Sequence, residues 1–262
     1  MTLLDAVGLP SLLLLVAAAI LAGALNAVAG GGSFLTFPSL VFAGVPPVRA
    51  NATSTVALWP GSAASVGAYR REMARVDRPL LAVLAATSLV GGVLGAVLLL
   101  RTPEAMFSAL VPYLLLGATL LFAGSPRVTS MLRNRSGGRS ASRRAGLAGI
   151  AFAQLAIAVY GGYFGGGIGI LMLATLGLMG IESIHEMNAL KATLAACING
   201  VAVVTFVLAG AVAWAPAVLM IVGSVVGGYG GASVARRVDP RLLRVAVIVV
   251  GCAMAGYFFL RR

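Results

Sequence analysis

The sequence predicts an all-α polytopic membrane protein made of two inverted-topology helical repeats that contain broken or re-entrant short helices. Of the 262 residues, 60% are hydrophobic and only 10% are charged, whereas soluble domains carry about 25% charged residues. Most apolar runs approach or exceed the roughly 18–20 residues that cross a bilayer core. Glycine triplets, Gly30–Gly32 and Gly165–Gly167, precede two unusually short apolar segments. Because every backbone group must be hydrogen-bonded within lipid, we expect the spanning elements to be helices.

Each half of the chain contains five apolar segments. They cover residues 9–29, 33–44, 50–68, 79–100 and 104–123 in the first half, and 145–163, 168–181, 187–210, 214–235 and 240–260 in the second. Residues 1–10 contain no basic residue, so the first segment is interpreted as a retained helix rather than a secretory signal. The two short segments suit re-entrant pieces because they cannot span ~30 Å of hydrocarbon. We expect eight to ten helical segments and six to ten crossings.

The two halves align with a nearly constant offset. Asn51-Ala52 matches Asn188-Ala189 at an offset of 137 residues, which also pairs Gly91 with Gly228, Pro103 with Pro240 and Ser62 with Asn199. The glycine triplets lie at an offset of 135, which places a two-residue insertion in the second short segment. The shared order of elements indicates a repeat. We therefore expect a first transmembrane repeat over 1–123, a basic cytoplasmic linker over 124–144 and a second repeat over 145–262.

Loop charges predict that the two repeats lie in opposite orientations. The linker 124–144 carries six arginines and no acid, which is typical of a cytoplasmic loop. The loop after the third segment carries Arg70, Arg71, Arg75 and Arg78, whereas its counterpart near 210–214 carries no charge. The loop after the fourth segment reverses this pattern, because the second half has Arg236, Arg237, Arg241 and Arg244 there and the first half is nearly neutral. Opposite orientation would place both termini away from the cytoplasm.

The glycine triplets are the strongest candidates for a binding site. Glycine accepts positive φ, and a helix that starts after such a turn presents free N–H donors to an anion. Paired broken segments in two halves are the best sequence pointer to a transporter site. The alternative is close helix packing through small residues, which we favour for five other glycines, namely Gly91, Gly92, Gly95, Gly223 and Gly227.

Small polar residues line one face of each segment that follows a short one. In the first half these are Asn51, Ser54 and Ser62, and in the second Asn188, Lys191 and Asn199. These faces offer donors without a carboxylate, which favours a polar or anionic substrate over a metal cation. Simple N-capping by Asn51 and Asn188 is the alternative interpretation.

Lys191 is the only lysine and lies in an apolar segment, where an unpaired ammonium is costly. It is a candidate counter-charge for an anion, with snorkelling or pairing with Glu182 or Glu186 as the alternative. His185 near Glu186 could relay protons, although a solvated loop histidine is the commoner situation.

Several function classes are excluded or disfavoured. The sequence contains no metal-ligand cluster, nucleophile elbow or P-loop, so we expect no metal, no cofactor and no enzymatic activity. All seven acids lie in or next to loops, which disfavours a cation pump. The basic residues lie in loops between apolar segments, so they indicate contact with anionic lipid rather than with nucleic acid.

The chain resembles a known family of membrane proteins over nearly its whole length. The resemblance rests on residues 26–40 and 44–55, which read NAVAGGGSFLTFPSL and GVPPVRANATST, and on residues 161–171 and 236–244, which read GGYFGGGIGIL and RRVDPRLLR. These stretches are similar to the TauE/SafE family, also called the sulfite exporter family. The resemblance implies a bacterial inner-membrane carrier of sulfur oxyanions or small organosulfur anions, with some members assigned other organic anions. The departure is Asn188-Ala-Leu-Lys191, where the family more often has a Thr-Ser pair.

Together these features predict a secondary transporter, and specifically an exporter, of a small sulfur-containing anion that works by alternating access in the bacterial inner membrane. Protons are a plausible coupling ion, and a homodimer is left open. The alternatives are a carrier for a carboxylate or other organic anion, a passive anion channel, and, less favoured, a membrane enzyme or scaffold. The expected substrate-binding residues are Asn26, Gly30, Gly31, Gly32, Ser33, Asn51, Thr53, Ser54, Gly165, Gly166, Gly167, Asn188 and Lys191.

Overall fold

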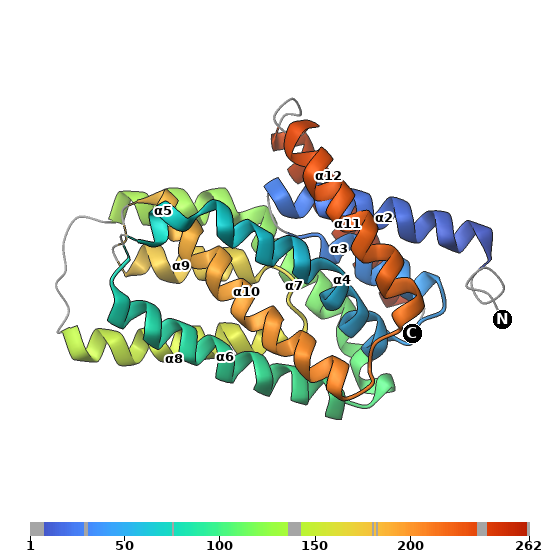
Figure 1. Cartoon of the computed structure of the whole chain (residues 1–262), viewed down its shortest axis with the longest axis horizontal. Coiled ribbons are helices and arrows are strands. Elements are labelled where there is room, and N and C mark those ends of the chain that lie inside the picture. Colours follow the sequence, from blue (N-terminus) through green and yellow to red (C-terminus); the bar gives the residue numbers. More distant parts are fainter. Residues whose placement is uncertain are drawn as a thin grey trace.

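The computed structural model describes residues 8–28, 31–74, 76–135, 143–179, 181, 183–234 and 240–260, and in these ranges all regular structure is helical (Figure 1). The helices are α2 (Leu9–Val28), α3 (Ser33–Phe42), α4 (Pro47–Ala68), α5 (Arg70–Met73), α6 (Arg78–Arg101), α7 (Glu104–Arg135), α8 (Arg143–Tyr163), α9 (Ile168–Leu178), α10 (Ile184–Leu208), α11 (Trp214–Val234) and α12 (Pro240–Leu260). Each of the ten expected segments corresponds to one helix, and α5 is an additional short one. The predicted all-α fold class is confirmed.

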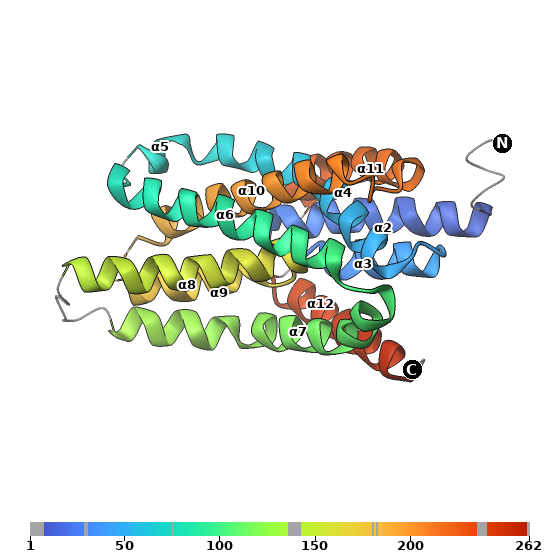
Figure 2. The same cartoon turned by 90° about the horizontal axis from the view of Figure 1, so that it is seen from below.

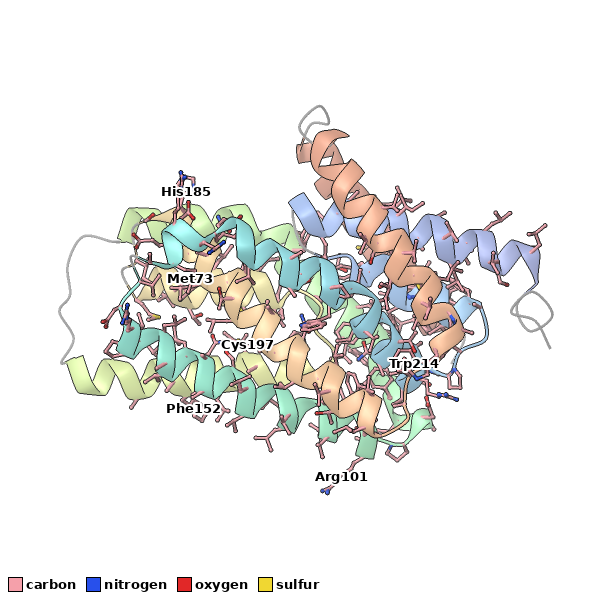
Figure 3. The ribbon with its side chains drawn as sticks, viewed as in Figure 1. Met73, Arg101, Phe152, His185, Cys197 and Trp214 are labelled. Atoms are coloured by element: carbon pink, nitrogen blue, oxygen red, sulfur yellow. The ribbon has the colours of Figure 1, made fainter. Side chains whose placement is uncertain are left out.

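The helices have the length and surface of a multi-pass membrane protein. Within the described residues, four helices are long and apolar enough to span a membrane, namely Leu9–Asn26, Arg78–Arg101, Glu104–Gly124 and His185–Leu208. Further apolar stretches are shorter, among them α3 and α9. Large apolar side chains are exposed along the outside, as at Phe152, which is 74% exposed and points away from the bundle in Figure 3. Such a surface suits lipid rather than water.

Several predicted boundaries need correction. α4 starts at Pro47 rather than residue 50, because the fixed φ of proline suits the first helical position. α10 starts at Ile184 rather than residue 187, because the Ser183 side chain accepts the Glu186 N–H and caps the helix there. α7 continues to Arg135 and α8 starts at Arg143, so a loop throughout 124–144 is wrong for residues 124–135 and 143–144.

The two longest helix–helix contacts each join a helix of the first half to a helix of the second half. α2 of the first half lies along α11 of the second, and α8 of the second half lies along α6 of the first (Figures 1 and 2). Glycines allow both close approaches, because a Cβ at Gly227 would overlap the carbonyl of Ile20 and one at Gly95 would overlap that of Val159. The small-residue interpretation of these glycines is therefore correct. A reciprocal exchange of this kind is the arrangement that a two-fold relation between halves produces.

α4 and α10 cross at equivalent residues. The Trp59 indole N–H donates to the carbonyl oxygen of Ala196 at 3.1 Å, and these two positions are 137 residues apart, which is the offset of the repeat. A residue that contacts its own equivalent marks the position of a pseudo-two-fold axis. The two helices run in opposite directions (Figure 2), because Thr53 in α4 contacts Ala213 after α10 and Met73 after α4 contacts Thr193 in α10. Which side of a membrane each end faces stays a prediction.

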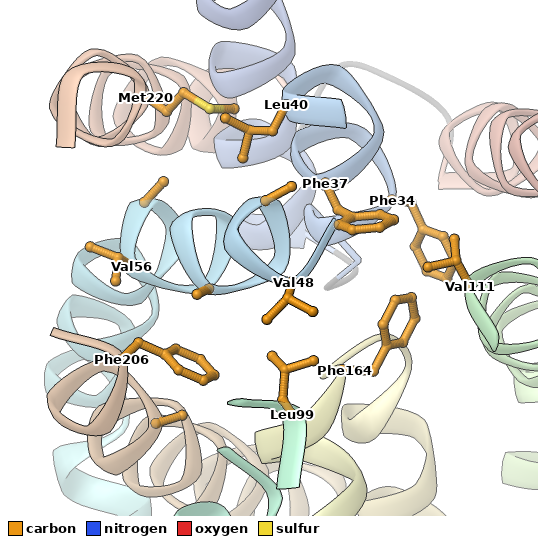
Figure 4. Packing of buried hydrophobic residues seen from close by; sticks show 14 of the residues in the cluster. Phe34, Phe37, Leu40, Val48, Val56, Leu99, Val111, Phe164, Phe206 and Met220 are labelled. Carbon is orange, nitrogen blue, oxygen red and sulfur yellow. The ribbon is translucent and has the colours of Figure 1, made fainter. Parts of the chain in front are cut away.

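The short helix α3 is enclosed by other helices. It packs against α2, α4 and α12, and Phe34, Phe37 and Leu40 are each at most 2% exposed. The Phe37 ring contacts three other rings, of Phe107, Phe164 and Phe258, with centroid distances of 6.3, 5.9 and 6.1 Å. Phe37 and Phe164 are both labelled in Figure 4. A helix of ten residues rises only about 15 Å, and a non-spanning helix is tolerated in a membrane where protein surrounds it.

Candidate functional site

Glycines break the chain between α2 and α3 and between α8 and α9. Gly31, Gly165 and Gly167 have φ of 99°, 80° and 77°, a region that residues with a Cβ rarely adopt. Gly32 has ordinary φ, but a Cβ there would lie 2.8 Å from the carbonyl oxygen of Ala22. Gly30 lies outside the described residues. The predicted turns before both short helices are therefore present, and Ser33 and Ile168 are the first helical residues.

The two breaks come together on one helix. A Cβ added at Gly31 would lie 3.8 Å from the Phe122 ring, and one at Gly167 would lie 3.5 Å from the carbonyl oxygen of Ala118. Ala118 and Phe122 are one turn apart on α7. The structure thus brings the two glycine triplets, which are 135 residues apart in sequence, to neighbouring turns of α7.

The break before α9 leaves backbone donors available. Ile170 and Leu171 donate their N–H groups to the carbonyl of Gly167, whereas the N–H groups of Ile168 and Gly169 have no acceptor in the described part of the chain. The Tyr160 hydroxyl donates to the Gly166 carbonyl at 2.7 Å and fixes the turn. This helix start can accept an anion.

Lys191 lies beside this helix start. A Cβ added at Gly169 would lie 3.3 Å from Cδ of Lys191, so the glycine makes room for the lysine side chain. The ammonium Nζ donates to Oδ1 of Asn188 at 2.9 Å, which is a neutral acceptor. The alternative that Lys191 pairs with a glutamate finds no support at Glu186, because no ion pair joins the two side chains in the described part of the chain. Glu182 lies outside the described residues. The aliphatic part of the Lys191 side chain thus packs against the first turn of α9.

The break before α3 is surrounded by hydroxyl and amide groups. The Thr36 and Ser54 hydroxyl oxygens are 2.6 Å apart, and Asn51 donates from Nδ2 to the carbonyl oxygen of Tyr163 at 3.0 Å. Asn26 Oδ1 accepts the Gly32 N–H at 3.2 Å, so one donor of this break is occupied. Thr36, Asn51 and Ser54 are each at most 3% exposed.

Two buried polar residues of α3 are not among the predicted site residues, and the capping role considered for two asparagines is wrong. Thr36 and Ser39 of α3 are buried, and Ser39 donates to the carbonyl of Thr36. Their position a few residues after the first glycine triplet is the sequence feature that could have identified them. The N-capping interpretation of Asn51 and Asn188 is wrong, because both lie inside helices that start four residues earlier, at Pro47 and Ile184.

The predicted site residues form two groups rather than one. Ser54 precedes Trp59 by five residues and Lys191 precedes Ala196 by five, and the antiparallel helices cross at Trp59 and Ala196. At 1.5 Å per residue, the two positions lie about 15 Å apart along the helices, on opposite sides of the crossing. The first group is Thr36, Asn51 and Ser54, and the second is Ile168, Gly169, Asn188 and Lys191. Thr53 belongs to neither group, because its Oγ1 accepts the Ala213 N–H.

Other features of the described residues do not form an anion site. A groove of about 220 Å³ between α2, α3 and α12 is apolar, and its one hydroxyl, Ser39, donates to the protein backbone. No three His, Cys, Asp or Glu side chains gather as metal ligands within the described part of the chain. His185 is exposed near the start of α10 and points outward in Figure 3.

Comparison with known proteins identifies the family. The model of the sulfite exporter TauE/SafE family matches residues 15–258. The chain belongs to the sulfite exporter TauE/SafE family. This assignment confirms the resemblance, and it makes the protein a member of a family of membrane transporters.

Curated relatives of this TauE/SafE member carry transporter names. The chain is 29% identical to the probable membrane transporter protein YfcA of Escherichia coli strain K12, over 91% of this chain and 86% of that protein. It is 28% identical to the probable membrane transporter protein ORF9 of Sinorhizobium sp, over 91% and 88%. A probable membrane transporter protein of Haemophilus influenzae is 26% identical over 95% of each chain. No solved structure matches the chain.

Proposed function

We propose that this protein is a secondary transporter that exports a small sulfur-containing anion, such as sulfite or an organosulfonate, across a bacterial inner membrane by alternating access. One observation carries the proposal. The first turn of α9, where the Ile168 and Gly169 N–H groups have no acceptor among the described residues, packs at Gly169 against the partly buried Lys191 side chain. An ammonium in that position is costly unless an anion or water compensates it.

The donors at this site suit an oxyanion. The two backbone N–H groups and the Lys191 ammonium, which carries three N–H donors, can hydrogen-bond the oxygens of a sulfite, a sulfonate or a carboxylate. The donor set therefore supports an anionic substrate, and the choice of a sulfur anion follows the sulfite exporter description of the family. The absence of a carboxylate among the residues of the group means that nothing there repels the anion.

The group of Thr36, Asn51 and Ser54 beside α3 would supply the second half of the path that the anion takes through the protein. Thr36, Ser54 and Asn51 carry no charge, so they can hydrogen-bond an anion without holding it as strongly as Lys191 does. We propose that the anion passes from one group to the other as the two halves rock about the crossing of α4 and α10. Movement of two repeats about a central site is the general mode of alternating access.

Transport assays on purified protein in liposomes test the proposal. We expect saturable counterflow of sulfite or a sulfonate. Lys191→Met should raise the substrate concentration for half-maximal flux at least about tenfold, since a charge-assisted hydrogen bond is worth about 1.5–3 kcal/mol. Arg101→Met is the matched control, because Arg101 is exposed at the end of α6. Counterflow of carboxylates alone would refute the sulfur assignment, and unsaturable current without counterflow would indicate a channel.

A further inference from the structure

Three hydrogen bonds tie the first turns of α4 to other parts of the molecule. The Val48 N–H donates to Oε2 of Glu104 at 3.0 Å, and Glu104 is the first residue of α7. The Thr53 hydroxyl accepts the Ala213 N–H at 3.0 Å, and the Arg49 guanidinium donates to the Val212 carbonyl at 3.5 Å. Val212 and Ala213 lie between α10 and α11, so α4 is held by both halves at this end.

The other end of the molecule lacks the residues for the same ties. At the repeat offset of 137, Thr53 corresponds to Leu190 and Glu104 to Arg241. A leucine side chain has no acceptor for a backbone N–H, and an arginine side chain has donors only. The start of α10 is instead capped by its own Ser183. The residues equivalent to Thr53 and Glu104 therefore cannot accept the backbone N–H groups that Thr53 and Glu104 accept.

We propose that these ties form the gate at the end where α4 begins, that the gate is closed in this structure, and that Thr53 and Glu104 are gating residues rather than substrate ligands. The inference rests on the proposed alternating access. Behind the gate, Ala57 has 0% exposure. When α4 separates from Ala213 and Glu104, water reaches Ala57 and the polar group of Asn51 and Ser54.

The charge of this end indicates which compartment the gate faces. This end carries Arg49 and Arg101 against Glu104. The opposite end carries Arg70, Arg71 and Arg78 against Glu72 and Asp77 in its α4–α6 connection, and the last part of α7 adds Arg127, Arg133 and Arg135. Positive loops stay in the cytoplasm. The proposed gate therefore faces away from the cytoplasm and must open to release an exported anion.

A cysteine reporter tests the gate without any substrate. Ala57→Cys, in a chain with Cys197→Ala and Cys252→Ala, places a thiol one turn behind Thr53 on α4. The rate of reaction with a charged methanethiosulfonate reagent then measures how often the gate is open. Adding Thr53→Val should raise this rate about fivefold, the effect of losing one ordinary hydrogen bond. Thr55→Val is the matched control, because its hydroxyl donates only to the Asn51 carbonyl of its own helix.

Equal labelling rates in the Thr53→Val and Thr55→Val chains would overturn the proposal. If Thr53→Val does not fold, as judged by its melting temperature, Glu104→Gln gives the same test, because it weakens the tie at Val48 and should also speed labelling. Because the assay contains no anion, faster labelling would support the gate even if the protein carried no sulfur compound. Failure of the proposed transport function and failure of the proposed gate can therefore be told apart.

Discussion

At the scale of single residues, backbone conformation and local space decide what each glycine does. Gly167 has φ of 77°, but a methyl group added there would make only ordinary contacts, the nearest at 3.5 Å. Gly61, in α4, has helical conformation and nothing within 4 Å of its Cβ position. Gly167 is therefore required only by its backbone dihedral angle. Gly61 is required neither by its dihedral angle nor by the space around it.

This contrast predicts the stability of two alanine variants. Gly167→Ala should lower the free energy of unfolding by about 1–2 kcal/mol, because the left-handed conformation is strained for a residue with a Cβ. Gly61→Ala should be neutral or raise stability by up to about 1 kcal/mol, since alanine favours a helix over glycine. Melting temperatures in one detergent check both. An equal loss in the two variants would show that the turn before α9 does not need its left-handed glycine.

At the scale of elements, sequence patterns predicted where the helices lie in the chain better than which helices pack together. The glycine triplets correctly marked the starts of α3 and α9, because a left-handed turn has a local cause. The start of α10 was missed although Ser183 and Glu186 have the spacing of a capping box, and Ser183 does accept the Glu186 N–H. The bond from Asn51 to Tyr163 joins residues 112 positions apart, and no local pattern encodes it. For the same reason the sequence suggested one site, whereas the crossing of α4 and α10 separates two groups.

The reciprocal packing of α6 on α8 and of α2 on α11 predicts matched effects in the two halves. Gly95→Ala and Gly227→Ala should each destabilise the protein by about 1–3 kcal/mol, because the added methyl meets a backbone carbonyl that cannot move alone. Gly117→Ala is the control, because its Cβ position on α7 is open. Melting temperatures measured in the same detergent test this. A loss at only one of the two sites would mean that the paired contacts are not energetically equivalent.

At the scale of the whole molecule, the exchange of partners explains why the repeat cannot be cut into two independent bundles. Each half contributes one helix to each of the two longest contacts, and the short helices α3 and α9 are covered by both halves. Both glycine breaks contact α7, so a movement of α7 relative to its neighbours would alter both breaks at once. This coupling is what a carrier requires if its two ends are to open alternately.

Opposite orientation of the halves is tested by labelling nearly equivalent loop positions. Arg71 lies one residue from the equivalent of Ala209, and both positions are exposed at opposite ends of the bundle. In cells expressing a chain without Cys197 and Cys252, an impermeant maleimide should label Ala209→Cys from outside. Arg71→Cys should react only after the membrane is opened, because the arginines near it retain that loop in the cytoplasm. Labelling of both positions from the same side would mean that the halves are parallel, and the proposed gate would then lose its assignment to the outer face.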